Sequence, residues 1–239
     1  MTVCHILRED PELAEAVPRA ARSRAIETCV ARTATVASGR WSARGTGAGE
    51  GAIGLLVLDG VLLRRVGVDG RFGAELLGQG DLLRPWQEED GSAALTRTTG
   101  WRVLESARLA VLDEAAARRL AAYPELTGRL VARALDRSRH LAVNMAIIHQ
   151  ARVHVRLHMM FWHLAERWGR VRSEGIFLPL SLTHSVLADL VAARRPTVTT
   201  GLAELYRRQL VRDLPRGWLL LGEPPGELLA TCGSSAARG

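Results

Sequence analysis

The chain contains no lysine, and all 32 of its basic residues are arginine. Because a whole residue type is missing, the arginine content most simply reflects genome base composition, and abundance alone does not identify a partner. The distribution of charge is more informative. Residues 149–222 hold 11 arginines against five acidic residues, whereas residues 1–148 hold 20 against 18. The positive charge is therefore concentrated in the C-terminal part, as the binding of a polyanion requires.

Cysteine is scarce, and long apolar runs are absent. Cys4, Cys29 and Cys232 lie far apart without CxxC spacing, which supports neither a disulfide framework nor a zinc site. Three thiols are also fewer than the four usual for an iron–sulfur cluster. No apolar run approaches the length of a membrane span, and residues 8–10 lack the order of a signal peptide. We therefore expect a cytoplasmic protein with no membrane partner.

In the N-terminal half, the residue pattern changes from one typical of helices to one typical of strands. Residues 9–40 are predicted to be helical, and Ser42–Gly51 to form a loop. From Ala52 onward, short apolar runs alternate with glycine turns, and Asp-Gly at residues 59–60 and 69–70 predicts hairpins. The further predicted strands are Ala74–Leu77, Leu82-Leu83, Ala93–Thr98, Trp101–Leu104 and Arg108–Leu112, with a turn at residues 78–81. Many short strands with close turns favour a small barrel or jelly roll.

A long helix is predicted from Pro124 towards Ile148. Some of its apolar residues recur close to every seventh position, although Arg137 and Asn144 interrupt the pattern. A narrow apolar stripe is typical of a helix that pairs with a copy of itself. The alternative is a helix packed on its own domain. The predicted dimer-interface residues are Leu126, Leu130, Ala134, Leu141 and Ile148.

The most informative stretch, residues 182–205, indicates two short helices joined by a tight turn. Thr183 is a good N-cap and Pro196 suits the first turn of the second helix. Val198, Leu202 and Leu205 then recur at helical spacing and are expected to point inward. A helix over residues 151–168 and a linker over Gly169–Gly175 precede this pair, and a two-stranded wing turning at residues 215–217 follows it.

The outer face of these helices is expected to carry the remaining residues, which are mainly threonines and arginines. Such groups suit DNA phosphates and base edges in a major groove. The alternative is an ordinary helical hairpin with a solvated arginine pair. The predicted DNA-binding residues are Thr183, Arg194, Arg195, Pro196, Thr197, Thr199, Thr200 and Arg216.

A β-rich segment, a long helix and then a winged helix-turn-helix is the order found in the Crp/Fnr superfamily of bacterial transcription regulators, which the chain resembles over residues 52–222. The similarity is most specific in LPLSLTHSVLADLVAARRPTVT and the wing RGWLLLG. The resemblance implies an α+β fold: an N-terminal β-roll or jelly-roll sensor domain, a long dimerisation helix and a C-terminal winged helix-turn-helix. It also implies a homodimer on a palindromic operator whose half-sites lie ~34 Å apart. Double-stranded DNA, a second copy of the chain and RNA polymerase are the expected partners.

The resemblance divides the chain into five segments. They are residues 1–50, a helical segment and loop; 51–122, a cyclic-nucleotide-binding-like β-roll; 123–150, the dimerisation helix; 151–222, the DNA-binding domain; and 223–239, a flexible tail.

The cyclic-nucleotide cassette of the family is missing. Arg84-Pro85 stands where the family has Gly-Glu, and residues 92–94 read Ser-Ala-Ala in place of Arg-Ser-Ala. The arginine that a buried phosphate needs is thus absent. We expect no cyclic AMP in the usual pose, assign no cofactor, and leave the small-molecule effector unidentified. Arg84, Trp86 and Gln87 are candidates for a different pocket, and the alternative is an Arg and a Trp that close the end of the barrel.

The recognition helix also departs from the family. Of the Arg-Glu-x-x-x-Arg reading set, Arg195 is kept, whereas Pro196 and Thr200 replace the other two. Losing the carboxylate removes an acceptor for the cytosine amino group, so we expect a different operator. Gly201 stands where a branched apolar residue is usual, which is expected to weaken the helix by about 1 kcal/mol relative to alanine.

Other chemistry has little support in the sequence. His154 and His158 have the i,i+4 spacing of a two-histidine ligand pair, but no carboxylate or cysteine completes the motif. Packed, hydrogen-bonded histidines are the alternative, and no metal ligand is assigned. No nucleophile elbow, P-loop or paired-carboxylate motif is present, so we expect no enzyme. A second hypothesis keeps the chain as a sensor or interaction module, responsive to haem or metal, that works through another regulator.

The charge distribution generates a first prediction. Affinity for promoter DNA from the gene's own neighbourhood should fall steeply as salt rises, because each neutralised phosphate releases condensed counterions. Mobility-shift titrations over a salt series measure the slope. No shift of any such fragment at low salt would contradict the DNA-binding hypothesis.

Overall fold

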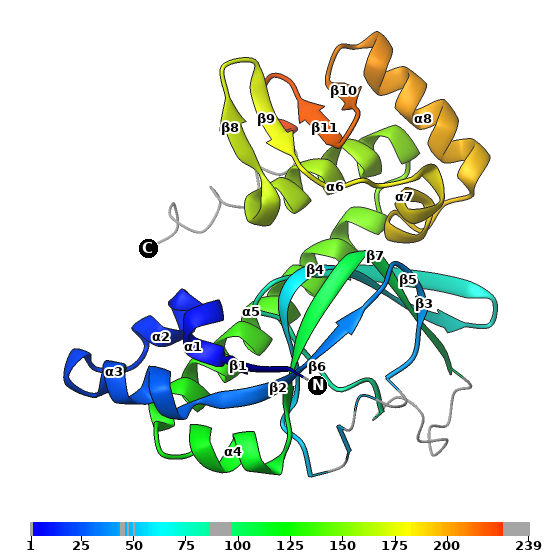
Figure 1. Cartoon of the computed structure of the whole chain (residues 1–239). Coiled ribbons are helices and arrows are strands. Elements are labelled where there is room, and N and C mark those ends of the chain that lie inside the picture. The colour runs from blue at the N-terminus through cyan, green and yellow to red at the C-terminus, as the bar shows by residue number, and fades with distance from the viewer. Residues whose placement is uncertain (1, 44–45, 47, 50, 87–96, 227–239) are drawn as a thin grey trace, which may run out of the picture. The chain divides into compact units, whose positions relative to one another are not determined.

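The computed structural model describes residues 2–43, 46, 48–49, 51–86 and 97–226. The chain divides into two compact units, Met1–Leu141 and Ala142–Gly239 (Figure 1). Helix α5 (Pro124–Ile148) begins in the first unit and ends in the second, with the bounds that the sequence predicted.

The first unit is built on one antiparallel sheet (Figure 1). Its main path runs β1-β2-β7-β4-β5, with β3 paired to β7 and β6 paired to β4. This confirms the prediction of a strand-rich N-terminal domain. The strands are β1 (Thr2–His5), β2 (Val30–Val36), β3 (Gly39–Trp41), β4 (Gly54–Val68), β5 (Arg71–Leu77), β6 (Leu82–Leu83) and β7 (Arg97–Leu112).

The predicted helix over residues 9–40 is wrong in its second half. Helices α1 (Ile6–Glu9), α2 (Pro11–Glu15) and α3 (Arg19–Thr28) occupy the first part, but β2 and β3 follow. Residues 30–36 contain four β-branched side chains, and β2 pairs with both β1 and β7. The pleated surface suits such side chains better than a helix does.

The two Asp-Gly pairs have different structures. Asp69 and Gly70 have φ angles of 49° and 70° and form the predicted hairpin turn between β4 and β5. The predicted turn at Asp59-Gly60 is wrong, because β4 continues through it with register shifts against β7. A Cβ on Gly60 would lie 2.5 Å from the carbonyl oxygen of Ser106, so glycine here permits a bulge that approaches the neighbouring backbone closely.

The predicted strands further along merge into longer ones. Trp101–Leu104 and Arg108–Leu112 belong to the single strand β7. Of the predicted strand Ala93–Thr98, only the last two residues lie in the described part, and they begin β7. The turn at residues 78–81 is confirmed, since the Asp81 carboxylate accepts from the Gly78 amide at 2.8 Å.

Alternating side chains of the sheet fill two apolar cores. One core lies among the strands and includes Leu55, Leu62 and Leu109. The other joins the opposite side of the sheet to the N-terminal helices, to α4 (Glu114–Leu120) and to the start of α5. Leu126 and Leu130 of α5 belong to this second core.

Two arginines tie α5 to the rest of the first unit. Arg133 donates two bonds to Asp10, at 2.5 and 2.9 Å. One turn later, Arg137 donates to both oxygens of Glu75, at 2.6 and 3.0 Å. Glu75 is buried and also lies 2.6 Å from the Nε atom of Arg64. Bidentate pairs of this kind combine strength with a fixed orientation.

Besides the end of α5, the described part of the second unit contains three helices and a four-stranded sheet. The elements are α6 (Val153–Trp168), β8 (Arg170–Arg172), β9 (Gly175–Leu178), α7 (His184–Leu190), α8 (Arg195–Arg207), β10 (Val211–Leu214) and β11 (Gly217–Leu220). The sheet order is β10-β11-β9-β8, so the predicted linker over Gly169–Gly175 is wrong: most of it forms a hairpin that extends the wing. Within the described residues, none of the helices has the length and apolar character needed to span a membrane.

The buried carboxylate on β5 generates a stability prediction. Glu75→Gln should lower the free energy of unfolding by about 3 kcal/mol, because two largely buried guanidinium groups lose their counter-charge. The matched control is Glu27→Gln, whose partner Arg8 is exposed, with an expected cost below about 1 kcal/mol. Denaturant unfolding of the full chain measures both, and equal effects would contradict this assignment.

Candidate nucleic-acid interface

The turn between α7 and α8 is held by contacts from inside and outside the pair. The Thr183 hydroxyl accepts from the amide of Val186 at 3.3 Å, which confirms the predicted N-cap. Ala192 adopts a φ of 49° in the turn. Arg156 on α6 donates to the carbonyl of Val191 at 3.1 Å and so satisfies an orphan carbonyl at the end of α7. This role of Arg156 could not be predicted from the sequence, because nothing in the local pattern links it to a turn 35 residues away.

One face of α8 is buried as predicted. Val198, Leu202 and Leu205 are almost fully inaccessible to solvent. Gly201 is buried among them, and a Cβ there would lie 2.9 Å from a methyl carbon of Leu157 and 3.4 Å from the backbone nitrogen of His154. The expected helix-weakening effect of Gly201 is therefore accompanied by a structural role, which is to let α8 approach the backbone of α6.

The opposite face of α8 is exposed and carries the predicted reading residues. Arg194, Arg195, Pro196, Thr197, Thr199 and Thr200 are all exposed. Pro196 lies in the first turn of α8, as predicted. Within the described part of the chain, neither Arg194 nor Arg195 takes part in an ion pair. The start of a helix also carries partial positive charge, so this end of α8 attracts anions.

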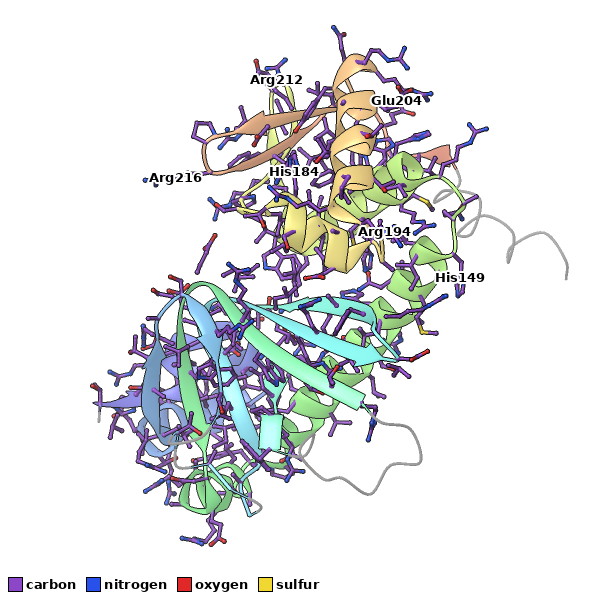
Figure 2. The ribbon with its side chains drawn as sticks, turned by 90° about the vertical axis from the view of Figure 1, so that its right-hand side faces the viewer. His149, His184, Arg194, Glu204, Arg212 and Arg216 are labelled. Atoms are coloured by element: carbon purple, nitrogen blue, oxygen red, sulfur yellow. The ribbon has the colours of Figure 1, made fainter. Side chains whose placement is uncertain are left out.

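The wing adds two more exposed arginines. Arg212 lies on β10, and Arg216 lies at the turn between β10 and β11. Figure 2 shows Arg216 at the tip of this hairpin, and labels Arg194 near the start of α8. The hairpin is anchored by Trp218, whose ring lies 4.9 Å from that of Phe161 on α6.

Three hydrogen bonds organise the threonines of α8. Thr199 donates to the carbonyl of Arg195 at 3.2 Å, and Thr200 donates to that of Pro196 at 3.3 Å. The Nδ1 atom of His184, the first residue of α7, lies 3.0 Å from the Thr199 hydroxyl (Figure 2 labels His184). The contact of His184 could not be predicted from the sequence, because a histidine after an N-cap forms no distinctive pattern.

The positive charge at the far end of α8 is partly compensated by a carboxylate of the same helix. Glu204 accepts from Arg207 and, at 2.6 Å, from Arg208. The hydrogen bond from Arg207, followed by that from Arg208, lowers the pKa of the Glu204 carboxyl. Among the described arginines of α8 and the β10–β11 hairpin, those without an ion pair are therefore Arg194 and Arg195 at the start of α8, with Arg212 and Arg216 on the hairpin.

Two of the candidate effector residues, Arg84 and Trp86, follow directly after β6. The Arg84 guanidinium carbon is 5.9 Å from the centre of the Trp86 ring. The Trp86 indole nitrogen is buried and, within the described residues, has no hydrogen-bond partner. Gln87 and the Ser-Ala-Ala segment at 92–94 lie outside the described residues.

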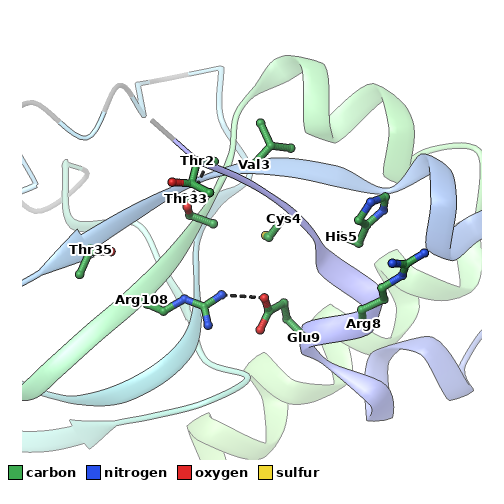
Figure 3. A pocket seen from close by; sticks show the side chains of 9 residues that line it. All are labelled: Thr2, Val3, Cys4, His5, Arg8, Glu9, Thr33, Thr35 and Arg108. Carbon is green, nitrogen blue, oxygen red and sulfur yellow. Dashed lines mark hydrogen bonds and ion pairs between the residues drawn. The ribbon is translucent and has the colours of Figure 1, made fainter.

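Two hollows lie elsewhere on the first unit. One, of about 160 Å³, is bordered by Asp81 and by Arg133 and Arg137 of α5, and is smaller than the about 300–1,000 Å³ typical of ligand pockets. The other, of about 360 Å³, lies beside β1, where Arg108 bonds Glu9 at 2.6 Å (Figure 3). Cys4 borders it, and burial raises the pKa of its thiol, which disfavours the thiolate form.

Two histidines of α6 make polar contacts within the helix. His158 accepts from the indole of Trp162 at 3.1 Å, and the Nδ1 atom of His163 lies 3.3 Å from Glu166. No cluster of three or more metal-ligating side chains occurs among the described residues.

The predicted dimer-interface residues differ in burial along α5. Leu126 and Leu130 are buried in the domain's own core, which supports for them the alternative of a helix packed on its own domain. Ala134 is exposed, and Leu141 and Ile148 are half-buried.

Comparisons with known proteins agree with this geometry. Residues 155–224 match the Crp-like helix-turn-helix domain family. A CooA mutant from Carboxydothermus hydrogenoformans is 16% identical, with 84% of this chain and 87% of that chain covered and a TM-score of 0.61. FixK2 from Bradyrhizobium japonicum is 14% identical (87% and 99% covered, TM-score 0.59). A CRP-family transcriptional regulator from Thermus thermophilus is 23% identical (79% and 92%, TM-score 0.54). No curated protein matches.

The fold is that of a winged helix-turn-helix protein with a strand-rich N-terminal domain. Residues 155–224 belong to the Crp-like helix-turn-helix domain family, and the chain shares its overall fold with solved proteins such as CooA and FixK2, which confirms the predicted resemblance.

The two ends of α8 generate a matched prediction. Arg195→Ala should weaken DNA binding by about 10- to 100-fold, because it removes a charged donor that has no protein partner. Arg207→Ala removes the same charge from the same helix, but from a residue already paired with Glu204. Its effect should be much smaller. Fluorescence anisotropy with a bound promoter fragment measures both, and equal losses would contradict the placement of the interface.

Proposed function

We propose that the chain acts as a homodimer that binds a palindromic operator through the N-terminal end of α8. The observation that carries the proposal is the exposed cluster of Arg194, Arg195 and three threonines on the face opposite the buried one. Cations and hydroxyls on a helix of this exposure suit insertion into a major groove.

Each predicted residue has a proposed role in this complex. Thr183 and Arg194, at the starts of the two helices, contact phosphates, and Arg216 on the wing does so beside them. Arg195, Thr199 and Thr200 face base edges, and Thr197 and Pro196 set the distance of α8 from the groove. RNA polymerase is the further partner through which such a complex affects transcription.

Dimerisation is proposed to use a different stripe of α5 from the one predicted. Val131, Leu135, Ser138, Ala142 and Met145 are spaced by alternating steps of four and three residues. Val131, Leu135 and Met145 are among the most exposed large apolar residues, at 54%, 56% and 61%. The four-three spacing is that of a coiled-coil seam. Ala134 flanks this stripe and stays in the proposed interface, with Leu141 and Ile148 at its border.

The effector is proposed not to be cyclic AMP in the usual pose. Arg84 and Pro85 replace the ribose-binding pair, and Arg133 and Arg137 of α5 are committed to Asp10 and Glu75. Arg84, Trp86 and Gln87 remain the proposed contacts for a different small molecule. The alternative of an interaction module that works through another regulator is not favoured, because α8 itself presents an unneutralised reading face.

The proposed dimer is tested by sedimentation velocity of the full chain. Leu135→Arg should convert the dimer to a monomer and abolish tight operator binding, because it places a charge in the seam. Val143→Arg is the matched control, since Val143 is an exposed apolar residue of α5 off the stripe. It should leave the dimer intact. A wild-type chain that sediments as a monomer at micromolar concentration would refute the homodimer.

A further inference from the structure

The hydroxyl hydrogens of Thr199 and Thr200 are already used inside α8. A threonine hydroxyl has one hydrogen and two lone pairs. In both residues the hydrogen is directed at the carbonyl one turn earlier, at 3.2 Å to Arg195 and 3.3 Å to Pro196. Such back-bonding is a known alternative for threonine in helices. Both exposed hydroxyls therefore present lone pairs, and not a hydrogen, to whatever binds α8.

His184 fixes this polarity at Thr199. Its Nδ1 atom lies 3.0 Å from the Thr199 hydroxyl oxygen, and the contact joins the first residue of α7 to the middle of α8. Since the hydroxyl hydrogen is used by the Arg195 carbonyl, both bonds are satisfied together when Nδ1 carries the ring hydrogen and donates. Contacts from two directions, together with the stiff χ1 of a β-branched side chain, hold the hydroxyl in one rotamer. One lone pair of Thr199 remains.

We propose that Thr199, oriented by His184, is an acceptor-only reading group that selects a base with an amino group in the major groove. This inference rests on the proposed function, in which α8 enters that groove. Adenine N6 and cytosine N4 are the donors displayed there, whereas guanine O6 and N7 and thymine O4 are acceptors. Thr199 accepts from the first two and has no hydrogen to offer the others.

The two threonine hydroxyls supply hydrogen-bond acceptors to a helix that lacks the family's carboxylate. Pro196 stands where the family carries a carboxylate, so no ionised acceptor is present at that position. Thr199 and Thr200 supply neutral acceptors one turn further along. His184 is a positioning residue in this scheme, because it acts through Thr199.

The first experiment selects bound sequences from randomised duplexes with the full chain and with Thr199→Val. Valine has nearly the shape of threonine without the hydroxyl, so the base pair whose discrimination falls identifies the position that Thr199 reads. The wild-type chain should prefer adenine or cytosine on the contacted strand there. Thr200→Val is the matched control, and it should affect a different position.

The second experiment removes single groups from the base. If the selected base is adenine, replacing it with purine, which lacks the N6 amino group, should weaken binding by about two- to tenfold. Replacement with 7-deazaadenine, which lacks only the N7 acceptor, should leave the affinity unchanged. If the base is cytosine, the analogue without the N4 amino group takes the place of purine.

The third experiment separates positioning by His184 from general structure. His184→Ala should lower discrimination at the Thr199 position alone, by the same about two- to tenfold. His184→Asn should restore it, because the asparagine amide nitrogen can occupy the place of Nδ1 and donate. Circular dichroism and thermal unfolding check that each variant is folded. If His184→Ala does not fold, the comparison of His184→Asn with the wild-type chain still tests the positioning role.

The outcomes separate this inference from the proposed function. Guanine or thymine at the Thr199 position, full discrimination in His184→Ala, or sensitivity to 7-deazaadenine would overturn the acceptor role while leaving a sequence-specific regulator. A wild-type chain that selects no sequence would refute the proposed function itself.

Discussion

The contact of Gly201 with α6 determines which face of α8 is exposed. With no side chain at this position, α8 approaches the backbone at His154 and the side chain of Leu157. The same face then buries Val198 and Leu202. Because one face of α8 is held this tightly, the residues about half a turn away face solvent. Helix α6 also carries Phe161, which packs on Trp218 of the wing, and Arg156, which holds the turn. The reading surface thus depends on one supporting helix.

In helix α5, the usual placement of charged and apolar side chains is reversed. Arg133 and Arg137 are directed toward buried or nearly buried carboxylates of their own unit, whereas Val131 and Leu135 are exposed. Buried ion pairs add little net stability but strongly disfavour alternative packings that would leave a charge unpaired. The ion pairs of Arg133 and Arg137 therefore fix the rotation of α5 about its own axis. In that orientation, the stripe that contains Val131 and Leu135 is exposed.

The sequence predicted the elements whose signals are local. The bounds of α5, the Thr183 cap and the wing turn depend on neighbouring residues, and all are confirmed. Features that depend on distant partners were missed. Strands β2 and β8 form because other strands accept them, and Asp59-Gly60 continues as a strand because β7 runs beside it, whereas Asp69-Gly70 turns. Apolar periodicity alone did not show which face of α5 was exposed. The bond from His184 to Thr199 spans 15 residues and has no pattern in sequence.

The central claim, that α8 of a dimer reads a specific operator, is tested most directly by mapping bound sites across the genome in living cells. The account predicts that the bound regions share one inverted repeat whose half-sites lie about one helical turn apart, ~34 Å along the duplex. Bound regions that share no common sequence, or a single unrepeated half-site throughout, would contradict it.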